Sequence, residues 1–196
     1  MSAASAFADA PLWYTTRSTA VIAFVLLTFS MMLGLASTQR AVASPSWPRF
    51  ATQTLHRNLS LLALAFVLAH IVTTVADAFV KVSWWAVVVP GMSQYKTAWV
   101  ALGTIAFDLM LVVVATSLLR NRLSLPAWRG IHLSVYALWP LAFVHFLQTG
   151  SDAAHRQWGF WLAVGAAVLL ALVVIARLRT RGQAARPAHR LAGAAR

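Results

Sequence analysis

One apolar segment decides the fold. Phe50–Phe79 reads FATQTLHRNLSLLALAFVLAHIVTTVADAF, and its histidines His56 and His70 lie 14 positions apart. The segment is long enough to cross the ~30 Å hydrocarbon core of a bilayer as a helix. At about 100° per residue the two histidines differ by about 40° around the helix axis, so they share a face. A histidine inside a bilayer is costly and indicates a functional site by default.

A second apolar segment, Trp128–Gln148, carries a matching pair. His132 and His145 lie 13 positions apart, which places them about 140° apart on a straight helix. Pro140 lies between them and can kink or re-register a helix. The spacing therefore predicts a shared face for the first pair, whereas the second pair requires an irregular helix.

Composition indicates an integral membrane protein. Of 196 residues 60% are hydrophobic and 10% charged, whereas a soluble domain carries about 25% charged residues. The sequence has no cysteine, which excludes disulfides, iron–sulfur clusters and thiolate metal sites. Five apolar runs predict an all-α bundle of five transmembrane helices, since short connections favour antiparallel neighbours. The expected helices are Arg17–Ser37, Phe50–Phe79, Thr97–Leu119, Trp128–Gln148 and Trp158–Ala176.

Arginine placement predicts the topology. Arginines collect in the connections between helices one and two and between helices three and four, and in the tail, all on one side of the predicted bundle. The positive-inside rule then places the N-terminus outside and the C-terminus in the cytoplasm, and it explains the net charge of +12 without nucleic acid. The first run is read as a retained helix and not as a signal peptide. We expect an N-terminal segment over 1–16, a transmembrane bundle over 17–179 and a basic, disordered cytoplasmic tail over 180–196.

The paired histidines predict haem. Two helices with two histidines each can hold two irons at two levels of the membrane, each iron between one imidazole from each helix. Because both helices run in the same direction, His56 pairs with His132 at the inner level and His70 with His145 at the outer level. The alternative is a set of hydrogen-bonded bundle histidines. A zinc or two-metal cluster is disfavoured, because the levels are about 20 Å apart and no carboxylate completes either shell.

Charged residues near the histidines have two interpretations each. Arg57 and Arg129 can bind haem propionates at the inner level, or they serve topology alone. Asp108 can relay protons, bond a ligand histidine or link helices. The connection Lys81–Lys96, with its tryptophans, is an aromatic interface belt or a lid over the outer haem. His155, in a connection, and His189, in the tail, are expected on the solvated surface.

Several motifs resemble a known family. The histidine spacings of 14 and 13 combine with the runs TSLLR at Thr116–Arg120 and WRGIH at Trp128–His132 and with Tyr136. Together they resemble the ferric reductase-like transmembrane domain, the haem-bearing core of ferric reductases, NADPH oxidases and the membrane haem subunit of the bacterial periplasmic methionine sulfoxide reductase system. The resemblance runs from about Thr19 to Ala176, and its end resembles short stand-alone bacterial members. It implies two b haems, with the four histidines as iron ligands.

The resemblance implies electron transfer across a bacterial cell membrane. A separate flavoprotein or a quinol is the expected donor, because the sequence holds no glycine-rich dinucleotide fingerprint. Ferric iron or an extracytoplasmic flavoprotein is the expected acceptor. The protein would then be the oxidoreductase membrane subunit of a ferric reductase-like system, with no catalytic side chain of its own. The alternatives are a haem-containing anchor that recruits an extracytoplasmic redox partner, and a haem-free bundle.

Overall fold

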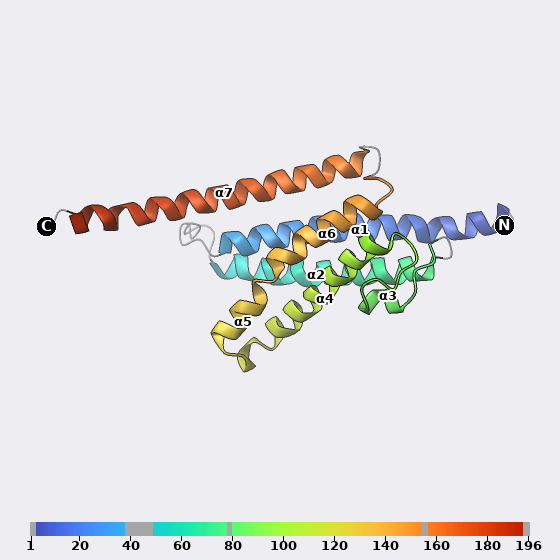
Figure 1. Ribbon diagram of the computed structural model, residues 1–196, viewed down its shortest axis with the longest axis horizontal. Coiled ribbons are helices and arrows are strands. Elements are labelled where there is room, and N and C mark those ends of the chain that lie inside the picture. The colour runs from blue at the N-terminus through green and yellow to red at the C-terminus, as the bar shows by residue number, and fades with distance from the viewer. Residues whose placement is uncertain (1–2, 38–48, 78–79, 154–156, 194–196) are drawn as a thin grey trace.

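The computed structural model describes residues 3–37, 49–77, 80–153 and 157–193; most of these are helical, and no strand occurs among them. The elements are α1 (Ala3–Ser37), α2 (Arg49–Ala76), α3 (Trp85–Val88), α4 (Thr97–Leu118), the 3₁₀ turn η2 (Arg120–Arg122), α5 (Leu125–His132), α6 (Val135–Thr149) and α7 (Trp158–Gly193). Figure 1 shows α1 and α2 side by side, with α4 and α6 crossing beside them and α7 reaching past the other helices.

Five stretches in the described residues are long and apolar enough to cross a membrane: Pro11–Ala36, Phe50–Ala76, Thr97–Leu118, Leu125–Thr149 and Trp158–Arg179. The predicted all-α membrane bundle of five helices is therefore confirmed. The first helix was predicted to begin at Arg17. In the structure α1 begins at Ala3 and runs through Pro11 without a break. The predicted division into domains stays a prediction, although the backbone of α7 is helical through Gly193.

The fourth spanning stretch is interrupted near His132 and not at Pro140. Helix α5 ends at His132, α6 begins at Val135, and α6 runs through Pro140 without a break. At the junction the backbone N–H groups of Ser134, Tyr136 and Ala137 each bond the carbonyl three residues earlier. Such bonds turn the chain by about 120° per residue instead of about 100°. This overwinding moves His145 toward the face of His132, in the direction that the 13-residue spacing requires.

Two apolar clusters hold the bundle together. One joins α1, α6 and α7, and in it the Phe24 ring stacks on Phe146 with centroids 4.7 Å apart. The other joins α2, α4 and α6 around Ala63, Met110 and Leu138. Burial of apolar side chains between helices gives close packing, whereas apolar side chains on the outer faces, such as Leu62 and Val72, remain exposed as lipid contact requires.

A buried side-chain hydrogen bond links α1 to α6. The Trp139 indole Nε1 donates to Thr28 Oγ1 at 3.1 Å, and both side chains are buried. We expect Thr28→Val to lower the free energy of unfolding by about 1–3 kcal/mol, because it leaves the indole N–H without an acceptor. Unfolding of the purified protein in mixed micelles of increasing denaturing-detergent content measures this.

Thr116→Val is the matched control. Among the described residues the Thr116 hydroxyl bonds carbonyls of its own helix α4 and of no other helix, so its loss should change the free energy of unfolding by less than about 0.5 kcal/mol. Equal losses in the two variants would mean that the bond between α1 and α6 contributes nothing specific.

Candidate di-histidine sites

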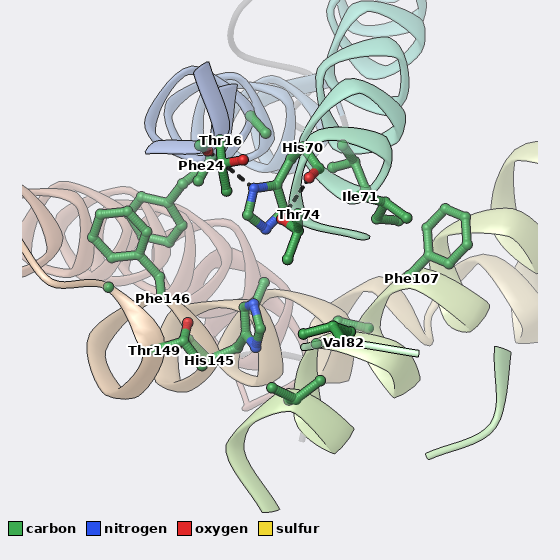
Figure 2. A pocket seen from close by; sticks show the side chains of 18 of the residues that line it. Thr16, Phe24, His70, Ile71, Thr74, Val82, Phe107, His145, Phe146 and Thr149 are labelled. Atoms are coloured by element: carbon green, nitrogen blue, oxygen red, sulfur yellow. Dashed lines mark hydrogen bonds between the residues drawn. The ribbon is translucent and has the colours of Figure 1, made fainter. Parts of the chain in front are cut away.

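The structure brings the four predicted histidines together in two pairs. His56 and His70 lie on α2, His132 is the last residue of α5, and His145 lies on α6. The rings of His56 and His132 have centroids 6.3 Å apart and planes inclined by 72°. His70 and His145 line one cavity, and Figure 2 shows their rings facing each other across it.

Helix α1 orients both histidines of α2. His70 Nδ1 lies 3.1 Å from the Thr16 carbonyl oxygen, and His56 Nδ1 lies 2.9 Å from the Ser30 carbonyl oxygen. The two carbonyls are 14 residues apart on α1, as the two histidines are on α2. Because the two helices are antiparallel neighbours (Figure 1), equal spacings bring each ring to its own carbonyl.

Helix α4 orients His145 in the same way. His145 Nδ1 lies 2.8 Å from the Trp99 carbonyl oxygen. A methyl group at Gly103, one turn further along α4, would lie 2.5 Å from two atoms of the imidazole ring. The ring therefore occupies the space that only glycine leaves open. Gly34 of α1 lies against the His56 ring less closely. A methyl group added there would lie 3.3 Å from the nearest ring atom.

These contacts fix the imidazole tautomers. A carbonyl oxygen can only accept, so the Nδ1 atoms of His56, His70 and His145 must carry the proton and donate it. In the neutral form of an imidazole protonated at Nδ1, the Nε2 atom keeps its lone pair for a metal. A backbone carbonyl is one of the usual outer partners of a metal-ligating histidine.

The ring spacing at the His56–His132 level suits one metal ion between two imidazoles. Metal–nitrogen bonds are about 2 Å long, and the ring centre lies about 1 Å behind the nitrogen, so two rings on opposite sides of one ion have centres about 6 Å apart. The observed 6.3 Å matches this. In the described residues no three or more histidine, aspartate or glutamate side chains form a metal-binding group.

The cavity at the His70–His145 level is apolar over most of its surface. Its volume is about 300 Å³, and Phe24, Phe107 and Phe146 are among its lining side chains (Figure 2). Its residues come from α1, α2, α4 and α6 and from the connection before α4. A flat, largely hydrophobic macrocycle with two axial imidazoles fits such a lining.

An ion pair lies at the polar end of this cavity. Arg17 Nε donates to Asp152 Oδ2 at 2.7 Å, and the second guanidinium edge contacts Asp152 Oδ1. The guanidinium also lies 3.9 Å from the centre of the Trp13 ring. The pair fixes α1 to the segment after α6. The sequence alone gave no sign of this pair, because the two residues lie 135 positions apart.

The connection before α4 has features of both interpretations offered for it. Val80, Val82 and Ala86 line the His70–His145 cavity, and the Ala86 carbonyl accepts a buried 2.6 Å hydrogen bond from Thr104 of α4. Trp84 and Trp85 are exposed, as an interface belt requires. The segment thus walls the cavity with one face and exposes its indoles on the other.

Three further predictions concern the charged residues and the outlying histidines. Arg57 and Arg129 are exposed, and neither side chain makes a hydrogen bond or an ion pair within the described chain, so both of their interpretations stay open. Asp108 is half-buried on α4 and likewise bonds no histidine there. His155 lies outside the described residues, and no side-chain placement is described for His189.

Gly103→Ala tests the close approach of α4 to His145. The added methyl group must displace the ring or separate α4 from α6, so we expect the free energy of unfolding to fall by about 1–3 kcal/mol. Gly165→Ala on α7 is the control, because nothing lies within 4 Å of its added methyl group. The free energy of unfolding of that variant should equal that of the parent or exceed it by up to about 1 kcal/mol, because alanine has a higher helix propensity than glycine. A parent-like Gly103→Ala protein would contradict the contact.

Comparison with known families gives one match. Residues 19–143 match the model of the family described as ferric reductase like transmembrane component. No curated protein and no solved structure matches the chain significantly. The family match covers more than half of the 196 residues and contains His56, His70 and His132. The chain is therefore a multi-pass membrane protein that belongs to the ferric reductase-like transmembrane family, whose members generally bind haem and transfer electrons across the membrane.

Proposed function

We propose that this protein carries single electrons across the membrane through two b haems. His56 and His132 ligate the inner iron, and His70 and His145 ligate the outer iron. The observation that carries the proposal is the paired geometry: two imidazoles face each other at each of two levels, and three of the four donate Nδ1–H to a backbone carbonyl. A bundle histidine that serves only packing has no need of a second imidazole beside it.

The two levels form a path along the bundle. The 14 residues between His56 and His70 span about 21 Å along α2, at about 1.5 Å per residue. A bound haem would supply one-electron chemistry at its iron. The four histidines would hold the two haems; carbonyls of α1 and α4 orient three of the four rings, and apolar walls exclude water from the His70–His145 cavity. Arg57 and Arg129 are proposed to pair with the propionates at the inner level.

The proposed direction is from the cytoplasm outward. The arginines at the end of the bundle that carries η2 and α5 favour a cytoplasmic position for that end. A quinol or a separate flavoprotein then reduces the inner haem, and ferric iron or an extracytoplasmic flavoprotein reoxidises the outer haem. An inside-negative potential favours outward transfer by about 2.3 kcal/mol per electron per 100 mV. The proposed location is the bacterial plasma membrane, because the sequence resembles short stand-alone bacterial members of the family.

Haem content and pairing give the first test of this function. The purified protein should bind two b haems per chain with low-spin spectra, as measured by a pyridine haemochrome assay. His70→Ala and His145→Ala should both remove the outer haem and leave the inner one, since each takes one imidazole from the same iron. Loss of one and the same haem in His70→Ala and His132→Ala would refute the pairing, and absence of haem b would refute the function.

Transport across a sealed membrane gives the second test. Proteoliposomes with a reduced flavin inside and an impermeant ferric chelate outside should reduce the chelate. His56→Ala and His145→Ala should each stop transfer, because loss of either haem leaves too long a gap. Gly165→Ala should conduct at the parental rate, since it contacts neither site. Parental rates in His56→Ala would exclude the inner haem from the path, and haems that are reduced but never reoxidised from outside would favour an anchor subunit.

A further inference from the structure

His132 is held differently from the other three histidines. Three of the four have an Nδ1–H bond to a carbonyl of a neighbouring helix. His132 Nδ1 is buried, and no hydrogen-bond partner for it exists in the described part of the chain. A ligating imidazole without such a partner is a weaker ligand, because the outer bond orients the ring and raises its basicity, and its loss weakens metal affinity by about 10–100-fold.

The backbone around His132 is also less constrained. His56, His70 and His145 lie within continuous helices, and each accepts at its own carbonyl a hydroxyl hydrogen bond from the residue four positions later: Ser60, Thr74 and Thr149. His132 is the last residue of α5, directly before the Leu133–Ser134 junction. Four positions after it stands Tyr136, whose hydroxyl accepts a hydrogen bond from Arg177. Rotation at the junction would move His132 without breaking a long helix.

The contact that does hold the His132 ring is a stack. Its plane is inclined by 26° to the Trp128 ring, with centroids 5.0 Å apart. The Arg120 guanidinium lies 4.7 Å from the Trp128 ring centre. Stacking defines the plane of the imidazole, but it supplies no acceptor for Nδ1. The Trp128 indole Nε1 is likewise buried and unpartnered within the described residues.

We infer that His132 is the exchangeable ligand of the two-level site, and that the inner iron can bind a small neutral ligand, such as carbon monoxide, in its place. This inference rests on the proposed function. When the His132 ring swings out, one iron–nitrogen bond breaks and the imidazole keeps its electron pair. The incoming ligand donates its own pair to the iron, so no oxidant or reductant is consumed. His56 stays bound opposite, held by the Ser30 carbonyl and packed against Gly34.

The first measurement uses the haem-loaded parent protein. It is reduced with dithionite in detergent and mixed with carbon monoxide, and the bound gas is read from the visible difference spectrum against total haem. One haem of the two should bind carbon monoxide, and the other should keep its low-spin spectrum. The binding rate should level off as the gas concentration rises, since dissociation of the His132 imidazole limits it. A parent with two haems that binds no carbon monoxide overturns the inference.

A matched pair of variants identifies the ligand. His132→Ala should keep the inner haem on His56 and bind carbon monoxide at a rate that rises linearly with gas concentration. His56→Ala should lose the inner haem and with it the response to carbon monoxide. The reverse result, or a response that survives unchanged in both variants, overturns the assignment. Failure of the proposed function looks different, because a parent without haem, or with haem content unaffected by all four histidine substitutions, contradicts haem ligation itself.

Discussion

A histidine ring inside a bilayer must find partners for two nitrogens, and the arrangement of this bundle follows from that requirement. Lipid offers no hydrogen bonds, so an unpaired polar atom there is costly. In this chain a carbonyl of a neighbouring helix takes the Nδ1–H of three rings. The Nε2 atom of each of these rings is left without that bond, and a second imidazole lies at the same level of the bundle. The same bond that satisfies one nitrogen therefore prepares the other for a metal.

Helix α1 has no histidine, yet both histidines of α2 depend on it. The carbonyls of Thr16 and Ser30 repeat the 14-residue spacing of His70 and His56 on the antiparallel neighbour. The Arg17–Asp152 ion pair, next to Thr16, fixes α1 to the segment that follows α6. A charged pair with little solvent contact is a strong constraint on geometry, although its net contribution to stability is small. In this way α1 sets the heights of both levels.

The sequence predicted the helices and the histidine levels because both depend on local pattern. The length of an apolar run predicts a membrane-spanning helix. Residue spacing along one helix predicts how far apart two histidines lie along its axis and whether they share a face. It did not reveal Gly103, since a glycine in an apolar run has no signal until the ring of His145 is placed against it. It did not reveal the Arg17–Asp152 pair either, because nothing in a single sequence connects residues on different helices. Backbone carbonyls as orienting partners are invisible in sequence for the same reason.

The difference between the two levels originates in the spacings themselves. On α2, 14 residues nearly complete four helical turns, so one regular helix can present both rings to one side. On the fourth spanning stretch, 13 residues turn about 140° less than four full turns. A regular helix therefore cannot present His132 and His145 on the same face. The chain overwinds at Leu133–Ser134 to recover part of that angle, and the irregularity lies next to His132 and well away from His145. The histidine beside the junction is therefore the one whose ring lacks a carbonyl partner within the described chain. The spacing of 13 residues between His132 and His145, against 14 between His56 and His70, thus leaves the His56–His132 level held by fewer contacts than the His70–His145 level.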